Sequence, residues 1–354
     1  MGVKDNGILQ TVTGWPAIRL GLECIYLGLW QLLQLAIRRL WKGRRRKLSP
    51  SASPVELRVD SSIGRHCYIK IMGVKYHYVE TGTKSGQLIL ILGDAPDTAN
   101  LWVPSWSSAV RRMAENDYHI VTLDLRGSGG SEGGSRRDLT PPKAVEELTA
   151  LLKALGVSES HPAIVIGFGI GGLLTWYLGH CHGSMVSKFI VAGAPHPNLY
   201  WQHPPSPFCL GSLHFIQWPH FPERWLAESE TRGDTKWASS RARDWSGALN
   251  YVRGAAWYRV HPEHKVQARG LLIGTKDSAA QLVASAQYCA SPALRLVAKP
   301  EPADKDIPPL VLDFIIGKKK QVEEIPRGLV TRMLGAVADR GRELTARLAL
   351  PANA

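Results

Sequence analysis

The chain has 354 residues, which is long enough for one large domain with additions. Its five cysteines are odd in number and scattered without a Cys-x-x-Cys pair, which fits a reducing compartment and no disulfide framework. The formal net charge of +13 lies mostly in the two ends, because residues 1–50 carry nine Lys or Arg against two acids and residues 318–354 carry eight against four. Residues 51–317 are nearly balanced, so the charge predicts anchoring of the ends and argues against a nucleic-acid-binding core.

The first element in chain order is an apolar stretch of 18 residues, 20–37, which is the lower limit for a membrane span. Seven cations follow between Arg38 and Lys47, and they predict that the folded domain faces the cytosol. A cleaved signal peptide is not expected, because the basic block follows the apolar run. Glu23 and two glutamines leave an alternative open, in which an amphipathic helix lies on the membrane surface or on the domain.

Alternation and apolar runs after the Ser/Pro-rich residues 49–54 predict a sheet covered by helices. Strands are predicted at residues 67–72, 74–79, 88–92, 119–123, 163–166, 189–192, 271–274 and 293–297, and core helices at 142–155 and about 308–316. The continuous apolar strands are typical of a parallel sheet buried on both faces. Residues 204–258 are rich in Trp, Pro and Arg without strand alternation, which indicates a mostly helical insertion.

The glycine-rich residues 167–172 (Gly-Phe-Gly-Ile-Gly-Gly) join a predicted strand to a predicted helix. Their spacing matches the dinucleotide motif G-x-G-x-x-G, but that motif opens the first strand-helix unit and needs an acid about 20 residues later, which is absent. The better interpretation is a nucleophile elbow, in which Gly167 and Gly171 are the small flanks and Gly169 stands at the nucleophile position. Gly169 is then expected at a φ that glycine adopts readily.

Five further stretches follow one another in a recognisable order. They are residues 124–129 (Asp-Leu-Arg-Gly-Ser-Gly), 194–198 (Ala-Pro-His-Pro-Asn), 215–223 (Phe-Ile-Gln-Trp-Pro-His-Phe-Pro-Glu), 250–253 (Asn-Tyr-Val-Arg) and 274–277 (Gly-Thr-Lys-Asp). With the elbow and the N-terminal apolar stretch, the chain resembles the membrane-anchored epoxide hydrolases of the α/β-hydrolase fold over about residues 65–316. The resemblance implies a mostly parallel sheet covered by helices, a shortened helical cap, no cofactor or metal, and an endoplasmic reticulum membrane with the domain facing the cytosol.

In that family an elbow aspartate attacks the epoxide to form an ester, a His-Asp pair activates the hydrolytic water, and two cap tyrosines hydrogen-bond the epoxide oxygen. The resemblance places Gly169 at the nucleophile, Glu301 at the base histidine, and Ser212 and Val252 at the two tyrosines. Asp277 alone matches, at the position that orients the base. It can equally be a loop carboxylate that makes local backbone hydrogen bonds.

The turn after the third strand, which reads His-Gly-x-Pro in the family and helps to bind developing negative charge, begins here at Leu92 and continues Gly-Asp-Ala. These losses predict a non-catalytic protein that binds a protein partner, a lipid or a hydrophobic ligand. The alternative is a hydrolase in which Asp94, Asp277 and Glu301 crowd one end of the sheet and raise one another's pKa.

The predicted organisation has six parts. They are an N-terminal anchor with its basic flank (1–48), a linker (49–64), the first part of the core (65–203), the cap (204–258), the second part of the core (259–317) and a basic amphipathic tail (318–354). The tail is expected to form a helix that packs on the domain or binds a membrane surface.

Overall fold

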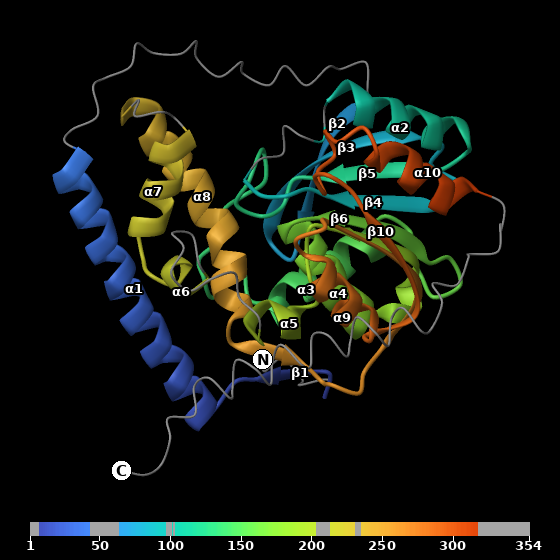
Figure 1. Cartoon of the computed structure of the whole chain (residues 1–354). Helices are drawn as coiled ribbons and strands as arrows, with labels where there is room; N and C mark the ends of the chain where they lie inside the picture. The colour runs from blue at the N-terminus through green and yellow to red at the C-terminus, as the bar shows by residue number, and fades with distance from the viewer. Residues whose placement is uncertain are drawn as a thin grey trace.

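The centre of the molecule is an eight-stranded sheet, seen in a computed structural model that describes residues 7–42, 64–96, 101, 103–202, 213–230 and 235–317 (Figure 1). The strand order is β10-β9-β7-β6-β4-β5-β3-β2. The strands are β2 (Arg65–Ile71), β3 (Val74–Gly82), β4 (Leu88–Leu92), β5 (His119–Leu123), β6 (Ala163–Phe168), β7 (Val186–Ala192), β9 (Val266–Gly274) and β10 (Cys289–Leu296). The strands from β10 to β5 are parallel and only the β3 and β2 edge is antiparallel, so the prediction of a mostly parallel sheet is confirmed.

Helices cover both faces of the sheet because its central strands are apolar on both sides. On one face α2 (Pro104–Glu115) and α10 (Ile307–Ile316) pack over Ile89 and Ile91 of β4. On the other face α3 (Pro141–Ala154), α4 (Ile170–Cys181) and α9 (Ala279–Ala286) pack over the alternate residues, Leu90 and Leu92 among them (Figure 1). The alternation along one strand therefore builds two separate hydrophobic clusters.

The insertion after β7 is helical, as expected. It contains α5 (Pro197–Gln202), α6 (Leu213–Ile216), α7 (Phe221–Glu230) and α8 (Thr235–Ala255), and the last three are called the cap helices below. The buried guanidinium of Arg253 on α8 donates to the carbonyls of Ile216 (2.7 Å) and Trp218 (2.5 Å) and to the Glu223 carboxylate (2.6 Å). One buried side chain therefore ties the three cap helices together.

The N-terminal segment folds onto the cap. Strand β1 (Leu9–Thr11) pairs antiparallel with β8 (Tyr258–Val260), a two-stranded ribbon that the sequence analysis did not predict. It leads into α1 (Trp15–Lys42), which lies along the outer side of the cap, away from the sheet (Figure 1). Leu20 and Cys24 of α1 pack against Ala256.

The prediction of a membrane span at residues 20–37 finds no support. Within the part of the chain that the structure describes, no helix is long and apolar enough to cross a membrane. One side of α1 is instead buried against the cap, where the indole of Trp218 donates to the carbonyl of Cys24 over 2.9 Å. The predicted tail, nearly all of the linker and residues 43–47, which hold four of the seven cations, lie outside the described residues.

Candidate functional site

The nucleophile elbow is formed where β6 passes into α4. Gly169 stands between the two elements with φ 49° and ψ −114°, so the expected positive φ is confirmed. The two flanking glycines are required by space, because a Cβ on Gly167 would overlap the backbone of Gly171, and a Cβ on Gly171 would overlap the backbone of Leu92. The chain has therefore kept the backbone of an elbow that carries no nucleophilic side chain.

Asp94 fills the space beside this glycine. It follows β4, whose Leu92 pairs with Gly167 of β6, so the loop after β4 lies next to the elbow. The Asp94 Oδ1 accepts a hydrogen bond from the backbone N–H of Ile170 over 2.9 Å. A Cβ built on Gly169 would overlap the Asp94 carboxylate. The carboxylate thus occupies the position into which a nucleophile at residue 169 would project.

This contact also involves the position at which an elbow binds negative charge. Elbow enzymes bind the reacting oxyanion with the backbone N–H of the residue after the nucleophile and with an N–H from the loop after the third core strand. Here the residue after the nucleophile position is Ile170, and its N–H already donates to Asp94. The chain therefore places its own negative charge there, at the N-terminus of α4, where the helix dipole favours an anion.

Tyr200 on α5 is a second group near Asp94, and the sequence analysis did not propose it. Desolvation, with a smaller contribution from the Asp94 carboxylate, raises the pKa of the Tyr200 phenol to about 12, so the phenol is protonated at neutral pH. Its only signal in the sequence is its place two residues after the stretch 194–198, which the resemblance assigns to a structural turn.

The other two predicted carboxylates lie at the same end of the sheet on other strands. Asp277 is exposed in the turn between β9 and α9, in which Thr275 and Ser278 hydrogen-bond each other. Its strand is separated from β4 by β7 and β6, which is about 14 Å at the usual strand spacing. Glu301 is exposed after β10, next to Pro300, which lies against Gly193 at the end of β7.

The vacated tyrosine positions and the start of the oxyanion turn are apolar or lie outside the described residues. Val252, at one tyrosine position, is buried in α8, and Ser212, at the other, lies outside the described residues. Leu92, at the start of the oxyanion turn, is fully buried. Phe168, before the elbow, is buried with its ring edge-on to Trp106 at 5.2 Å between centroids, so it fills the core.

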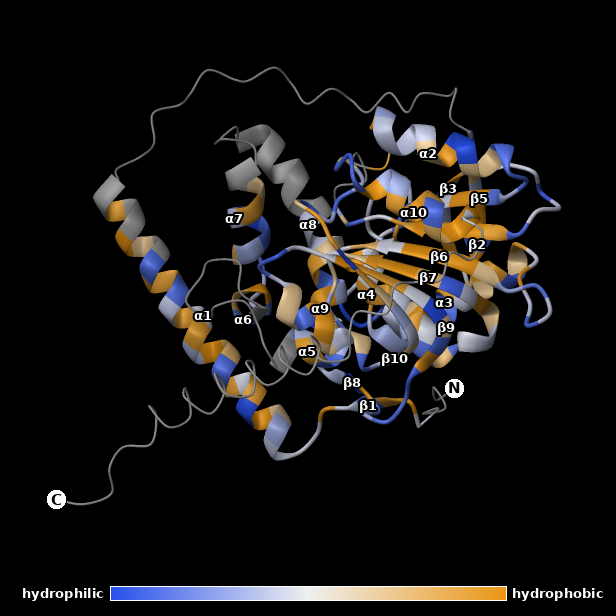
Figure 2. Ribbon diagram, turned by 45° about the vertical axis from the view of Figure 1, so that its right-hand side comes forward, coloured by the Kyte–Doolittle hydropathy of each residue, from blue (hydrophilic) through white to orange (hydrophobic). Residues whose placement is uncertain are grey.

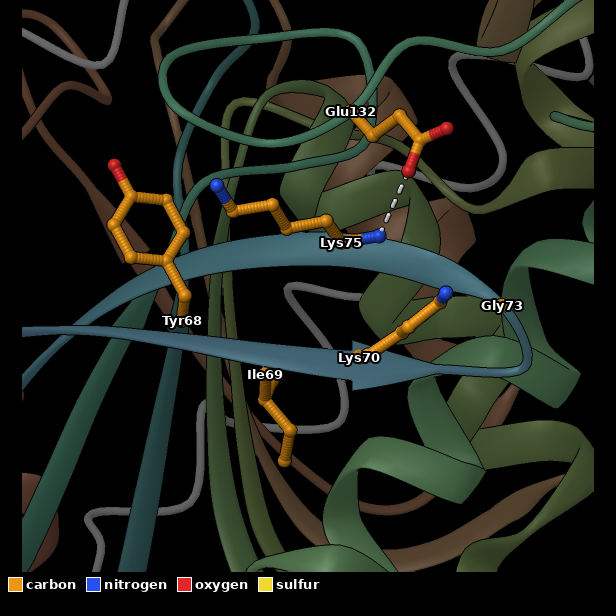
Figure 3. A pocket seen from close by; sticks show the side chains of 6 residues that line it. All are labelled: Tyr68, Ile69, Lys70, Gly73, Lys75 and Glu132. Atoms are coloured by element: carbon orange, nitrogen blue, oxygen red, sulfur yellow. Dashed lines mark hydrogen bonds between the residues drawn. The ribbon is translucent and has the colours of Figure 1, made fainter.

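Two surface hollows lie away from the elbow. One, of about 470 Å³, is lined by side chains of the β2–β3 hairpin, including Tyr68, Lys70 and Lys75, together with Glu132, at the edge of the sheet (Figure 3). The other, of about 270 Å³, lies where Arg112 of α2 approaches Lys305, before α10. No group of three or more His, Cys, Asp or Glu among the described residues could hold a metal ion.

Comparison of the sequence with known proteins points to one family. A family model described as "Alpha/beta hydrolase family" matches residues 89–338. Epoxide hydrolase 4 of Mus musculus is 32% identical over 179 residues, covering 49% of this chain and 48% of that protein. Epoxide hydrolase 3 of Xenopus tropicalis is 34% identical over 170 residues, covering 46% and 44%. The chain thus spans about half the length of the curated relatives it matches.

Solved structures agree at the level of the fold. An epoxide hydrolase from Vigna radiata superposes with a TM-score of 0.56 at 18% identity, over 73% of this chain and 99% of that one. A protein described as a putative alpha/beta hydrolase from Nostoc gives 0.58 at 15% identity, over 71% and 97%.

Proposed function

The chain belongs to the alpha/beta hydrolase family, and from this premise we propose that it is an epoxide hydrolase-like protein without turnover, which acts at a membrane by binding a protein partner, a lipid or a hydrophobic ligand. The observation that carries the proposal is the pair of residues at the elbow. Gly169 has no side chain with which to attack a substrate, and the Asp94 carboxylate accepts the N–H of Ile170.

A negative charge at that N–H opposes the usual chemistry of the fold. Oxyanion-hole donors act by stabilising negative charge that develops during the reaction, and the loss of one donor typically lowers kcat by about 10²–10³-fold. Here the donor is occupied by a group of the same sign as the developing charge. The family's own groups are absent at the other positions, since Val252 and Ser212 carry no phenol and Glu301 stands in place of the base histidine.

Membrane association is proposed from the N-terminal segment. The sequence of α1 ends in basic residues, and seven cations lie between Arg38 and Lys47. Cations at this end favour the cytoplasmic surface of a membrane that contains anionic lipids. We therefore place the folded domain on the cytosolic side, with the endoplasmic reticulum as the proposed membrane.

One observation favours a second function. The Asp94 carboxylate lies where the family's nucleophile would lie, and the protonated phenol of Tyr200 lies near enough to be influenced by it. A carboxylate oxygen could attack an epoxide carbon, the ring C–O bond would break, and the released alkoxide would take the phenol's proton. This would give a hydroxyalkyl ester on Asp94, and its hydrolysis would still need a base for water.

The test is a panel of epoxides and esters incubated with the purified full chain, read both as product and as intact protein mass. If the protein has no turnover, as proposed, neither catalytic product nor added mass should be found. Added mass that is lost in Asp94→Asn would support the second function as a single attack. Multiple turnover that survives in Asp94→Asn but is lost in Asp277→Ala or Glu301→Ala would contradict both proposals and favour the other carboxylates.

A further inference from the structure

The outward face of α1 is mostly apolar along its length. Ten large apolar side chains of this helix are between 41% and 82% exposed, and they recur at intervals of one to four residues. They are Trp15, Ile18, Leu22, Ile25, Tyr26, Leu29, Trp30, Leu33, Ile37 and Leu40, called the α1 stripe below. At 3.6 residues per turn these positions fall within an arc of about 140°. Figure 2 shows the apolar colouring of this helix beside the cap.

The opposite side of α1 is fixed to the cap. Leu20, Cys24 and Gln31 are buried there. Between them Gly28 receives the indole of Trp218, because a Cβ at this glycine would overlap the ring. The same indole donates to the carbonyl of Cys24 over 2.9 Å. The rotation of the helix about its axis is therefore set by the cap, which turns the α1 stripe away from the protein.

The charge of the segment suits a lipid surface. At the margin of the stripe Arg19 and Glu23 pair with each other over 2.8 Å. The helix sequence then becomes basic at its C-terminal end, where residues 38, 39 and 42 are Arg, Arg and Lys, and four more cations follow by residue 47. Aromatic residues such as Trp15, Tyr26 and Trp30 are enriched where protein meets the headgroup region. An apolar stripe beside clustered cations is the pattern of a helix that lies in the plane of an anionic membrane.

We propose that the α1 stripe inserts into the plane of an anionic lipid surface and that the Trp218 contact with Gly28 holds the cap helices against that surface. This rests on the proposed membrane role and specifies its surface, its lipid charge and the orientation of the domain. The chain's own tail is a poor occupant of the stripe, because residues 318–354 carry eight cations against four acids and would face the basic end of α1. A second copy would bring the same basic segment.

The first experiment measures binding of the full chain to vesicles by co-sedimentation. Binding is expected with vesicles of phosphatidylcholine containing 30% phosphatidylserine and is expected to weaken with phosphatidylcholine alone. The double variant Leu22→Glu/Leu29→Glu should reduce the bound fraction at least about tenfold, because both side chains are exposed on the stripe. The matched control is Tyr68→Glu/Leu296→Glu, since these side chains are equally exposed elsewhere on the surface.

Equal binding by the stripe variant, or no binding by the unsubstituted chain, would overturn the proposal. A dimer in sedimentation velocity that disappears in the stripe variant would assign the face to a second copy instead. Binding that is lost on deletion of residues 321–354 but kept in the stripe variant would assign it to the tail. The hydrolysis panel uses no vesicles, so failure of this proposal and failure of the proposed lack of turnover are seen separately.

The second experiment tests the orientation with two glycines of the same helix. Gly28→Leu should expel the Trp218 indole, whereas Gly21→Leu is its control because a Cβ at Gly21 meets no atom within 4 Å. Both variants keep the α1 stripe and should bind vesicles. Hydrogen exchange in residues 213–227 should slow on vesicle binding in the unsubstituted chain and in Gly21→Leu, and should remain fast in Gly28→Leu. Equal protection in Gly28→Leu, or none in the unsubstituted chain while it is bound, would overturn the claim about the cap.

Discussion

The carboxylate of Asp94, in the loop after β4, accepts the backbone N–H of Ile170, the first residue of α4, over 2.9 Å. The two residues are 76 positions apart in sequence, and they meet because β4 and β6 are neighbours in the sheet. The contact satisfies an N–H that a helix leaves without an internal partner, and it places a negative charge at the positive end of the helix. The Asp94 side chain thus occupies the N–H of Ile170 at the elbow.

Restoring an aspartate at the elbow should therefore cost stability. In Gly169→Asp the new side chain would be held at a positive φ, which costs about 1–3 kcal/mol, and its Cβ would overlap the Asp94 carboxylate. Urea denaturation should show a loss of at least this size. Gly133→Asp is the control, because a Cβ there meets no atom within 4 Å, and it should change stability by less than about 0.5 kcal/mol.

Removing the competing carboxylate should recover part of that loss. The double variant Gly169→Asp/Asp94→Gly is expected to be more stable than Gly169→Asp alone, since the overlap is relieved while the backbone strain remains. Neither variant should turn over epoxides, because the base histidine and the two phenols are absent. Multiple turnover by either variant would show that the catalytic groups have been misplaced.

The Tyr200 phenol should titrate at lower pH when Asp94 loses its charge. Desolvation is the larger cause of its pKa of about 12, and the Asp94 carboxylate adds to it by disfavouring a second negative charge. In Asp94→Asn the pKa should fall but stay above the ordinary value near 10, because the phenol remains desolvated. Tyrosinate absorbance during alkaline titration, with Tyr200→Phe subtracted to identify the residue, measures this. An unchanged titration curve would show that the charge of Asp94 does not influence the pKa of Tyr200.

A chain of three histidines, which joins His180 of α4 to His196 and His264, depends on neutral rings. The backbone N–H of Asn198 donates to His196 Nδ1 over 3.2 Å. His196 Nε2 and His180 Nε2 lie 2.9 Å apart, and so do His180 Nδ1 and His264 Nδ1. With His196 accepting from Asn198, each ring can donate to the next in turn only if all three are neutral. Desolvation, with the adjacent His264, lowers the pKa of His180 to about 3, and desolvation with His180 lowers that of His196.

Stability should therefore fall as the pH drops from about 6.5 toward 3. In that range the unfolded chain binds protons that the folded rings do not, so the free energy of unfolding rises with pH by up to about 1.4 kcal/mol per pH unit for each histidine. Denaturation midpoints of His180→Gln should depend less steeply on pH than those of the unsubstituted chain. His161→Gln, at an exposed site, is the control. Equal slopes for the unsubstituted chain and His180→Gln would contradict the neutral histidine chain.

An in-plane α1 makes a prediction about extraction from cellular membranes. Alkaline carbonate should release the protein, because a helix lying in the interface does not cross the bilayer. High salt alone should release only part of it, since insertion of the α1 stripe is not electrostatic. A protein with a known spanning helix is the control for retention. If the chain stays with the membrane through carbonate, residues 20–37 span it and the in-plane arrangement is wrong.

The fold and the backbone of the elbow could be predicted from local sequence. Uninterrupted apolar runs such as residues 88–92 are compatible only with burial on both faces, and β4 is buried throughout. The elbow could be predicted because a sharp turn between a strand and a helix favours glycine, which adopts a positive φ without a Cβ clash. Gly169 has φ 49°. That position 169 itself offers no nucleophile follows directly from the sequence, because glycine has no side chain.

The replacement at the elbow and the outward face of α1 were decided by the tertiary structure. Asp94 is one of several acids near the ends of strands, and only the pairing of Leu92 with Gly167 brings its carboxylate, and not that of Asp277, to Ile170. From the sequence, the apolar run of residues 20–37 left a spanning helix, a surface helix and a packed helix open. The contact between Gly28 and Trp218, which lies 190 residues away, determines which side is buried. Local patterns fix backbone conformation, whereas contacts between distant segments depend on how those segments are placed against each other.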